Sequence, residues 1–171
     1  MTEVTLADFT LSPEKRASIC AGLTARQTGL VNKWMDLHEV LNRGDFDGMD
    51  AFFHPDMHYS NPNRPDLGTY ASWKSSPMAL WRVFPPCVYR TVDAWAKGEN
   101  EITVLCHHWG KQTGGRYWGK EPTGREINVW WYSTVTFKDD KIIHIYSIAD
   151  VLSMLQGLGV IDLQMPADPY A

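Results

Sequence analysis

Residues 127–148 read INVWWYSTVTFKDDKIIHIYSI, and this stretch decides the fold. It holds two runs rich in β-branched and aromatic residues, 127–137 and 141–148, which is the composition of β-strands. The residues between them, Lys138-Asp139-Asp140, form a typical hairpin turn. The stretch therefore predicts two adjacent antiparallel strands.

The residues before this hairpin extend the same pattern. Residues 88–96 and 102–109 are also rich in β-branched and aromatic residues, and residues 97–100 (KGEN) supply a turn between them. A longer connection, residues 110–124, contains five glycines and one proline. Four successive strands predict an antiparallel meander in the C-terminal half of the chain.

Helical patterns dominate the N-terminal half. An apolar stripe with spacings of four, three and four predicts a long helix that ends near Gly44; the stripe consists of Leu30, Trp34, Leu37 and Leu41. A short helix over residues 46–53 should stop at His54-Pro55, and a short strand should follow over 57–61. Residues 70–84 suggest a third helix, although Pro77 should disturb its first half.

Helices followed by an antiparallel meander predict an α+β fold in one domain. The length, 171 residues, is that of a single domain. We expect residues 1–12 to form an extended arm, residues 13–163 the domain and residues 164–171 a tail.

Composition excludes several classes of function. The net charge is −4 and no basic run stands out, which argues against nucleic-acid binding. No apolar run approaches the ~20 residues of a membrane span, and the first ten residues lack a signal-peptide pattern. Three cysteines at wide spacing fit neither a zinc site nor a disulfide framework. These features favour a cytoplasmic protein without metal or membrane contact.

Known cofactor and nucleophile motifs are missing. Residues 114–120 have the glycine and lysine spacing of a phosphate loop, but Glu121 replaces the required Ser or Thr. His107 and His108 are adjacent, so on a strand they point to opposite faces and cannot share a metal. No Gly-x-Ser-x-Gly motif occurs. We therefore expect no cofactor.

Eight tryptophans are too many for one domain to bury easily, because each indole N–H needs a partner. Alternation along residues 127–137 places Trp131 and Ser133 on one face of the sheet and Trp130 and Tyr132 on the other. We expect the helices to cover one face and a second copy of the chain to cover the other, which predicts a homodimer.

Three residues are candidates for proton transfer. His108 shares a strand face with the apolar Ile102 and Val104, where it is either a core histidine or a catalyst. Asp150 follows an apolar strand, where it either caps a helix that begins at Val151 or faces a dry cavity. Tyr59 lies on the short first strand, where its hydroxyl either contacts a backbone carbonyl or donates to a developing oxyanion.

Four strings in the sequence resemble the nuclear-transport-factor-2-like superfamily, and most of all its SnoaL-like branch of polyketide cyclases. They are 42–56 (NRGDFDGMDAFFHPD), 114–124 (GGRYWGKEPTG), 137–142 (FKDDKI) and 150–159 (DVLSMLQGLG). The resemblance implies a cone-shaped fold in which N-terminal helices pack in a curved, mostly antiparallel sheet. It also implies that Asp150, which opens the last string, is the acid–base residue. The Asp-Pro pair that carries the base of ketosteroid isomerase is replaced here by Asn61-Pro62.

The superfamily includes lyases of aromatic-degrading bacteria, and this leads to our first expectation for function. It is a cofactor-independent lyase for a bulky, hydrophobic aromatic substrate, such as one that removes water and formaldehyde from a lignin-derived diarylpropane diol. The alternatives are a polyketide cyclase or isomerase, and a non-catalytic small-molecule binding or dimerisation module. The expected catalytic residues are Asp150, Tyr59 and His108. The expected substrate-binding residues are Trp34, His38, Asn61, Trp118 and Trp131.

Overall fold

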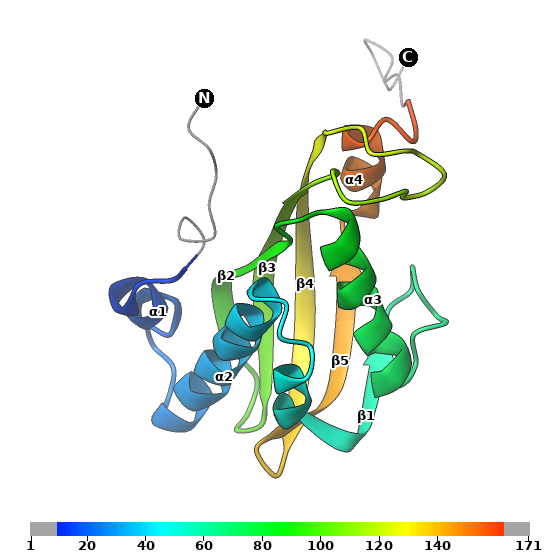
Figure 1. Cartoon of the computed structure of the whole chain (residues 1–171). Coiled ribbons are helices and arrows are strands. Elements are labelled where there is room, and N and C mark those ends of the chain that lie inside the picture. The colour runs from blue at the N-terminus through cyan, green and yellow to red at the C-terminus, as the bar shows by residue number, and fades with distance from the viewer. Residues whose placement is uncertain (1–9, 163–171) are drawn as a thin grey trace, which may run out of the picture.

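The computed structural model describes residues 10–162, in which two helices lie against one face of a curved five-stranded sheet (Figure 1). Residues 1–9 of the expected arm and the expected tail, 164–171, lie outside the described residues. The elements in chain order are α1 (Pro13–Ile19), α2 (Ala25–Asn42), a 3-10 helix η2 (Gly48–Phe52), β1 (Phe53–Ser60), α3 (Tyr70–Val83), β2 (Val88–Ala96), β3 (Glu101–Lys111), β4 (Glu126–Lys138), β5 (Lys141–Ala149) and α4 (Val151–Gly157).

The sheet has the strand order β1-β5-β4-β3-β2. Strands β2 to β5 form the predicted antiparallel meander, and β1 pairs with β5 in parallel. The β4–β5 hairpin closes tightly, with Lys138 opposite Lys141. The two residues between them, Asp139 and Asp140, have φ angles of 50° and 60°, as a two-residue hairpin turn requires. The predicted α+β class and mostly antiparallel sheet are confirmed.

Side-chain caps fix where the helices begin. The Ser12 hydroxyl accepts a hydrogen bond from the Lys15 N–H at the start of α1. Thr24 caps α2 in a reciprocal capping box with Gln27, and Thr69 does the same for α3 with Ser72. These caps satisfy backbone N–H groups that have no partner within the helix.

Two local predictions differ from the structure. The short helix after α2 is only the 3-10 turn η2, and the chain is already extended at Phe53, before Pro55. Pro55 is tolerated because β1 is an edge strand, where a missing N–H costs little. Helix α3 also runs unbroken through Pro77, which removes only the hydrogen bond that its N–H would donate to Trp73.

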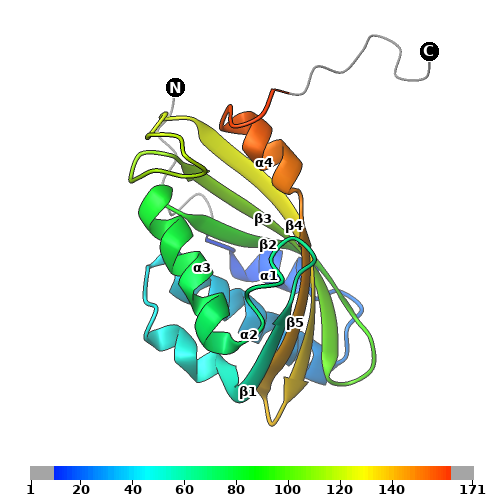
Figure 2. The same cartoon turned by 90° about the vertical axis from the view of Figure 1, so that its right-hand side faces the viewer.

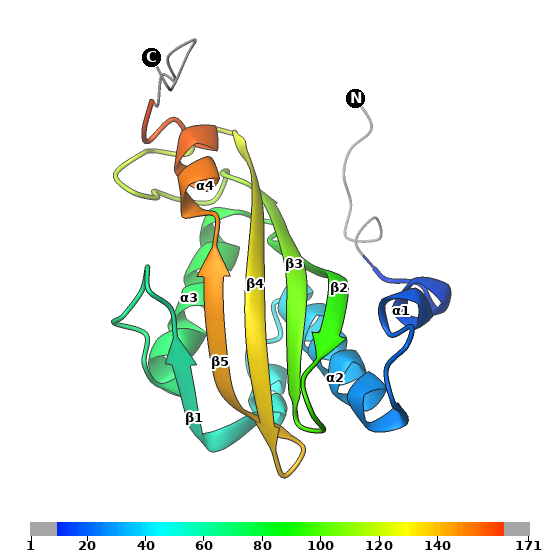
Figure 3. The same cartoon turned by 180° about the vertical axis from the view of Figure 1, so that it is seen from behind.

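The curvature of the sheet creates a concave side, against which α2 and α3 pack (Figure 2). Figure 3 shows the opposite, outer face of the sheet, with α2 and α3 behind it. Alternation sorts the side chains as predicted, because Ile102, Val104 and Cys106 are fully buried on the concave side. Within residues 10–162 no helix combines the length and apolar character needed to cross a membrane.

Candidate active site

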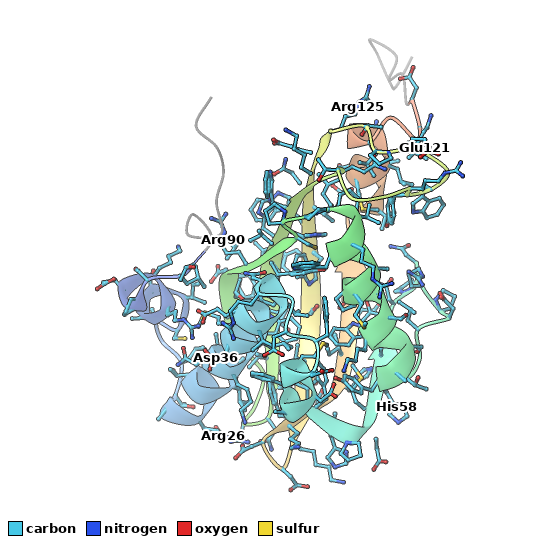
Figure 4. All side chains as sticks on the ribbon, in the orientation of Figure 1. Arg26, Asp36, His58, Arg90, Glu121 and Arg125 are labelled. Atoms are coloured by element: carbon cyan, nitrogen blue, oxygen red, sulfur yellow. The ribbon has the colours of Figure 1, made fainter. Side chains whose placement is uncertain are left out.

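A cavity of about 420 Å³ lies between α2, α3 and the concave face of the sheet. This volume falls in the range of pockets for small organic molecules. Side chains from the helices and the sheet meet in this space, whereas the labelled Glu121 and Arg125 lie near α4 and Asp36 lies between α1 and α2 (Figure 4). Aromatic side chains form much of the cavity wall: Trp34, Tyr59, Trp73, Tyr89, Tyr117, Trp118 and Trp131.

His38 projects from α2 into this wall and is almost completely buried. Its Nδ1 lies 3.2 Å from the hydroxyl oxygen of Thr91. The rings of Trp34 and Trp131 meet the imidazole edge-on, with centroids 5.0 and 5.9 Å away. Burial lowers the pKa of His38 to about 3, and nearby His108 adds to this effect. His38 is therefore neutral at pH 7.

His108 lines the cavity from β3 and is also neutral, because burial lowers its pKa to about 3. Its Nε2 lies 2.9 Å from the sulfur of Cys87, and the ring of Tyr89 stacks on it at 4.6 Å. Burial raises the pKa of the Cys87 thiol to about 12. The pair is thus a neutral thiol and a neutral imidazole, unlike the thiolate and imidazolium of a cysteine nucleophile.

Polar groups at the end of β1 form another part of the lining. The Asn61 amide donates a hydrogen bond to the hydroxyl of Tyr59, 2.9 Å away. Arg64, on the following turn, also lines the cavity and binds Asp66 through two hydrogen bonds. Trp118, in the loop between β3 and β4, contributes to the lining while 60% exposed. This combination of exposure and lining places Trp118 at the cavity rim.

Asp150 lies outside this cavity. Its carboxylate accepts a hydrogen bond from the Ser153 N–H, 3.0 Å away, and so caps α4. Its neighbours Ala149 and Val151 line the cavity, but Asp150 itself does not. Hydrogen bonding to Ser153 lowers the Asp150 pKa. Asp150 therefore occupies the helix-cap position, whereas the family resemblance implied an acid–base group that faces the cavity.

The structure thus brings together seven of the eight predicted site residues around one cavity: Tyr59, His108, Trp34, His38, Asn61, Trp118 and Trp131. Throughout the described part of the chain, neither Asp nor Glu contributes to the cavity lining. Nor do residues 10–162 contain a cluster of three His, Cys, Asp or Glu side chains that could hold a metal ion.

Some polar groups at this cavity were not predicted from the sequence. Tyr89 and Ser147 line it, and Cys87 contacts His108 behind its wall. Alternation had placed Ser133 on the same face as Trp131, but nothing indicated that its hydroxyl would meet another one. The pairing of β4 with β5 provides that contact.

A family model described as a SnoaL-like domain matches residues 31–145. The chain belongs to the SnoaL-like domain family. The matched region begins inside α2 and ends inside β5, and it contains α3 and β1 to β4. It therefore includes most of the elements that form the cavity of this SnoaL-like protein. No curated protein matches the sequence.

Solved structures share the fold of this SnoaL-like protein. AclR from Streptomyces galilaeus, a candidate hydroxylase, is 16% identical with a TM-score of 0.72, over 80% of this chain and 99% of AclR. IdmH from Streptomyces antibioticus, a candidate polyketide cyclase, is 21% identical with a TM-score of 0.67, over 76% and 98% of the two chains. A SnoaL-like polyketide cyclase from Agrobacterium tumefaciens is 15% identical with a TM-score of 0.62, over 76% and 98%.

Proposed function

We propose that this SnoaL-like protein is a cofactor-free acid–base enzyme of the polyketide cyclase or isomerase type. Its substrate would be a hydrophobic, oxygenated aromatic molecule held in the cavity. The observation that carries the proposal is the composition of the lining, where two buried neutral histidines lie among aromatic side chains. Family membership supports an enzyme of this kind.

Cyclisation by aldol addition and isomerisation of a ketone both begin with loss of a proton from the carbon beside a carbonyl. A neutral imidazole can accept that proton through its unprotonated nitrogen. If the Nδ1–H of His38 donates to Thr91, Nε2 of His38 keeps its lone pair for this step. Tyr59 would donate its hydroxyl hydrogen to the oxygen on which negative charge develops.

The named relatives favour this reaction type over the diarylpropane lyase. Two of the three structures described above carry polyketide cyclase in their names, and none is named as a lyase. Release of formaldehyde from a phenolic diaryl diol remains the assay for the lyase alternative. A binding module without chemistry would catalyse neither reaction.

The test is exchange of the C1 protons of 2-tetralone for deuterium in D2O, followed by NMR. This bicyclic ketone is apolar and has acidic protons beside its carbonyl. We expect the wild-type protein to accelerate exchange and Ala149→Phe to abolish the acceleration, because a ring at position 149 fills the cavity. Ala71→Phe, on the exposed side of α3, is the matched control and should behave as wild type. Binding of 2-tetralone without faster exchange would refute the catalytic proposal.

We also propose that the active form is a homodimer joined through the outer face of the sheet. Large apolar side chains are exposed on three strands of this face: Trp95, Trp130, Tyr132, Tyr146 and Ile148. Monomeric proteins rarely expose a contiguous patch of this kind, and a second copy would cover it symmetrically. Sedimentation equilibrium would test this proposal, and a monomer at all protein concentrations would contradict it.

A further inference from the structure

Two serines meet in the floor of the cavity. Ser133 on β4 and Ser147 on β5 are directly opposite each other in the sheet, and their hydroxyl oxygens are 2.7 Å apart. Their exposed fractions are 1% and 6%, and both line the cavity. They interrupt an otherwise apolar floor, which includes Trp131, Ile145 and Ala149.

A count of hydrogens shows what this pair can offer. Each serine hydroxyl has one hydrogen to donate, so the two carry two. Their mutual hydrogen bond uses one, and no other acceptor is recorded for either hydroxyl among residues 10–162. One buried O–H is therefore left without an acceptor. A buried polar hydrogen without a partner is unfavourable, and a ligand atom that accepts it removes that cost.

The charges around the cavity indicate that the ligand atom at the serines is an uncharged acceptor. Arg64 is the cationic side chain of the lining, and it is engaged by Asp66. A carboxylate or phosphate would lack a free countercharge beside the serines. An uncharged acceptor, such as a ketone or quinone oxygen, needs only the available hydroxyl hydrogen.

We propose that the Ser133–Ser147 pair is a subsite that holds a carbonyl oxygen of the ligand. This inference rests on the proposed function and specifies how the substrate is oriented. The strand register places β1 residues beside the serine pair. Strand β1 runs parallel to β5 with Ser60 opposite Tyr146, so the next residue, Asn61, comes beside Ser147. A ligand carbonyl on the serine pair would thus lie in the same cavity as Asn61 and Tyr59.

The experiment compares the binding of 1-tetralone and tetralin, which differ only by a carbonyl group, by isothermal titration. We expect the wild-type protein to bind 1-tetralone about three- to tenfold more tightly, as one neutral hydrogen bond of about 1 kcal/mol implies. Either single variant, Ser133→Ala or Ser147→Ala, keeps one hydroxyl with a free hydrogen and should retain the preference. The double variant should bind the two compounds equally.

A matched control lies on the other face of the same sheet. Thr103 and Thr134 also form a hydroxyl pair across neighbouring strands, with oxygens 3.2 Å apart, but they do not line the cavity. Thr134→Val removes that pair and should leave the preference for 1-tetralone unchanged. A loss of preference equal to that in the double serine variant would show an effect on the sheet instead of a subsite.

The outcomes separate the subsite from the proposed function. Equal affinities for 1-tetralone and tetralin in the wild type would overturn the subsite and leave the apolar cavity in place. Binding of neither compound would overturn both. If the double variant does not fold, infrared spectra of carbonyl-labelled 1-tetralone bound to the wild type test whether its carbonyl accepts a hydrogen bond. A carbonyl stretch lower than in hexane supports the hydrogen bond, and an unchanged stretch refutes it.

Discussion

The two buried histidines should make the stability of the protein depend on pH in a specific window. His38 and His108 each have a pKa of about 3 in the folded chain, against an ordinary value of 6.5 when unfolded. Between these values the unfolded state binds more protons than the folded state, so stability falls as pH falls. Stability should be independent of these groups above pH 6.5 and lost progressively from pH 6.5 toward pH 3.

The loss of stability depends on how many pH units the solution lies below the pKa of the unfolded histidine. Each pH unit costs about 1.4 kcal/mol per histidine, and pH 5 lies about 1.5 units below the unfolded value. Each histidine should therefore cost about 2 kcal/mol between pH 8 and pH 5, and the pair about 4 kcal/mol. That is a large share of the 5–15 kcal/mol that typically stabilises a domain.

Urea unfolding at pH 8, 7, 6 and 5 measures this loss. His38→Asn keeps a polar atom near the Nδ1 that contacts Thr91, and His108→Gln keeps one near the Nε2 that contacts Cys87. Each variant should lose about 2 kcal/mol less than wild type on going to pH 5. His107, whose pKa is also lowered by burial, is present in every variant and cancels in the comparison. Equal losses in wild type and the double variant would refute the reasoning.

Three further predictions concern packing, capping and association. Gly114→Ala should destabilise the fold by about 2 kcal/mol in urea unfolding, because the new Cβ would lie 1.9 Å from the Arg82 carbonyl oxygen. In the control Gly115→Ala the new Cβ meets open space, so stability should be nearly unchanged. Asp150→Ala should cost about 1 kcal/mol of stability through loss of the α4 cap, whereas Asp150→Ser should keep most of that stability in the same unfolding assay. Equal losses in the Ala and Ser variants would contradict a capping role. Tyr132→Glu should shift the proposed dimer to monomer in sedimentation experiments, and an unchanged mass would exclude this face as the interface.

Much of the fold could be predicted because strand patterns are local. The run predicted at 88–96 coincides with β2, and the Lys138-Asp139-Asp140 turn is the observed hairpin. Proline residues were less reliable than strand patterns for predicting where elements end. Pro55 and Pro77 were expected to end or disturb their elements, but an edge strand and a helix that gives up one hydrogen bond accommodate them.

The site was predictable only in part. Trp34 and Trp131 line the cavity, and the apolar stripe of α2 and the alternation along β4 were enough to place them on the faces that meet there. The Cys87–His108 contact joins residues 21 positions apart and depends on the register of β2 against β3, which the sequence does not encode in any short motif. For Asp150 the family string and the local capping pattern pointed in different directions, and the observed placement follows the local one.

One measurement tests the central claim most directly, namely that proton transfer belongs to the buried histidines. It is the rate of deuterium exchange into 2-tetralone by the wild type, by His38→Asn/His108→Gln and by Asp150→Asn, at pH 7.5 and with all three proteins shown to be folded. We predict that the histidine double variant loses the acceleration and that Asp150→Asn keeps it. Acceleration that survives in the histidine variant and disappears in Asp150→Asn would contradict this account.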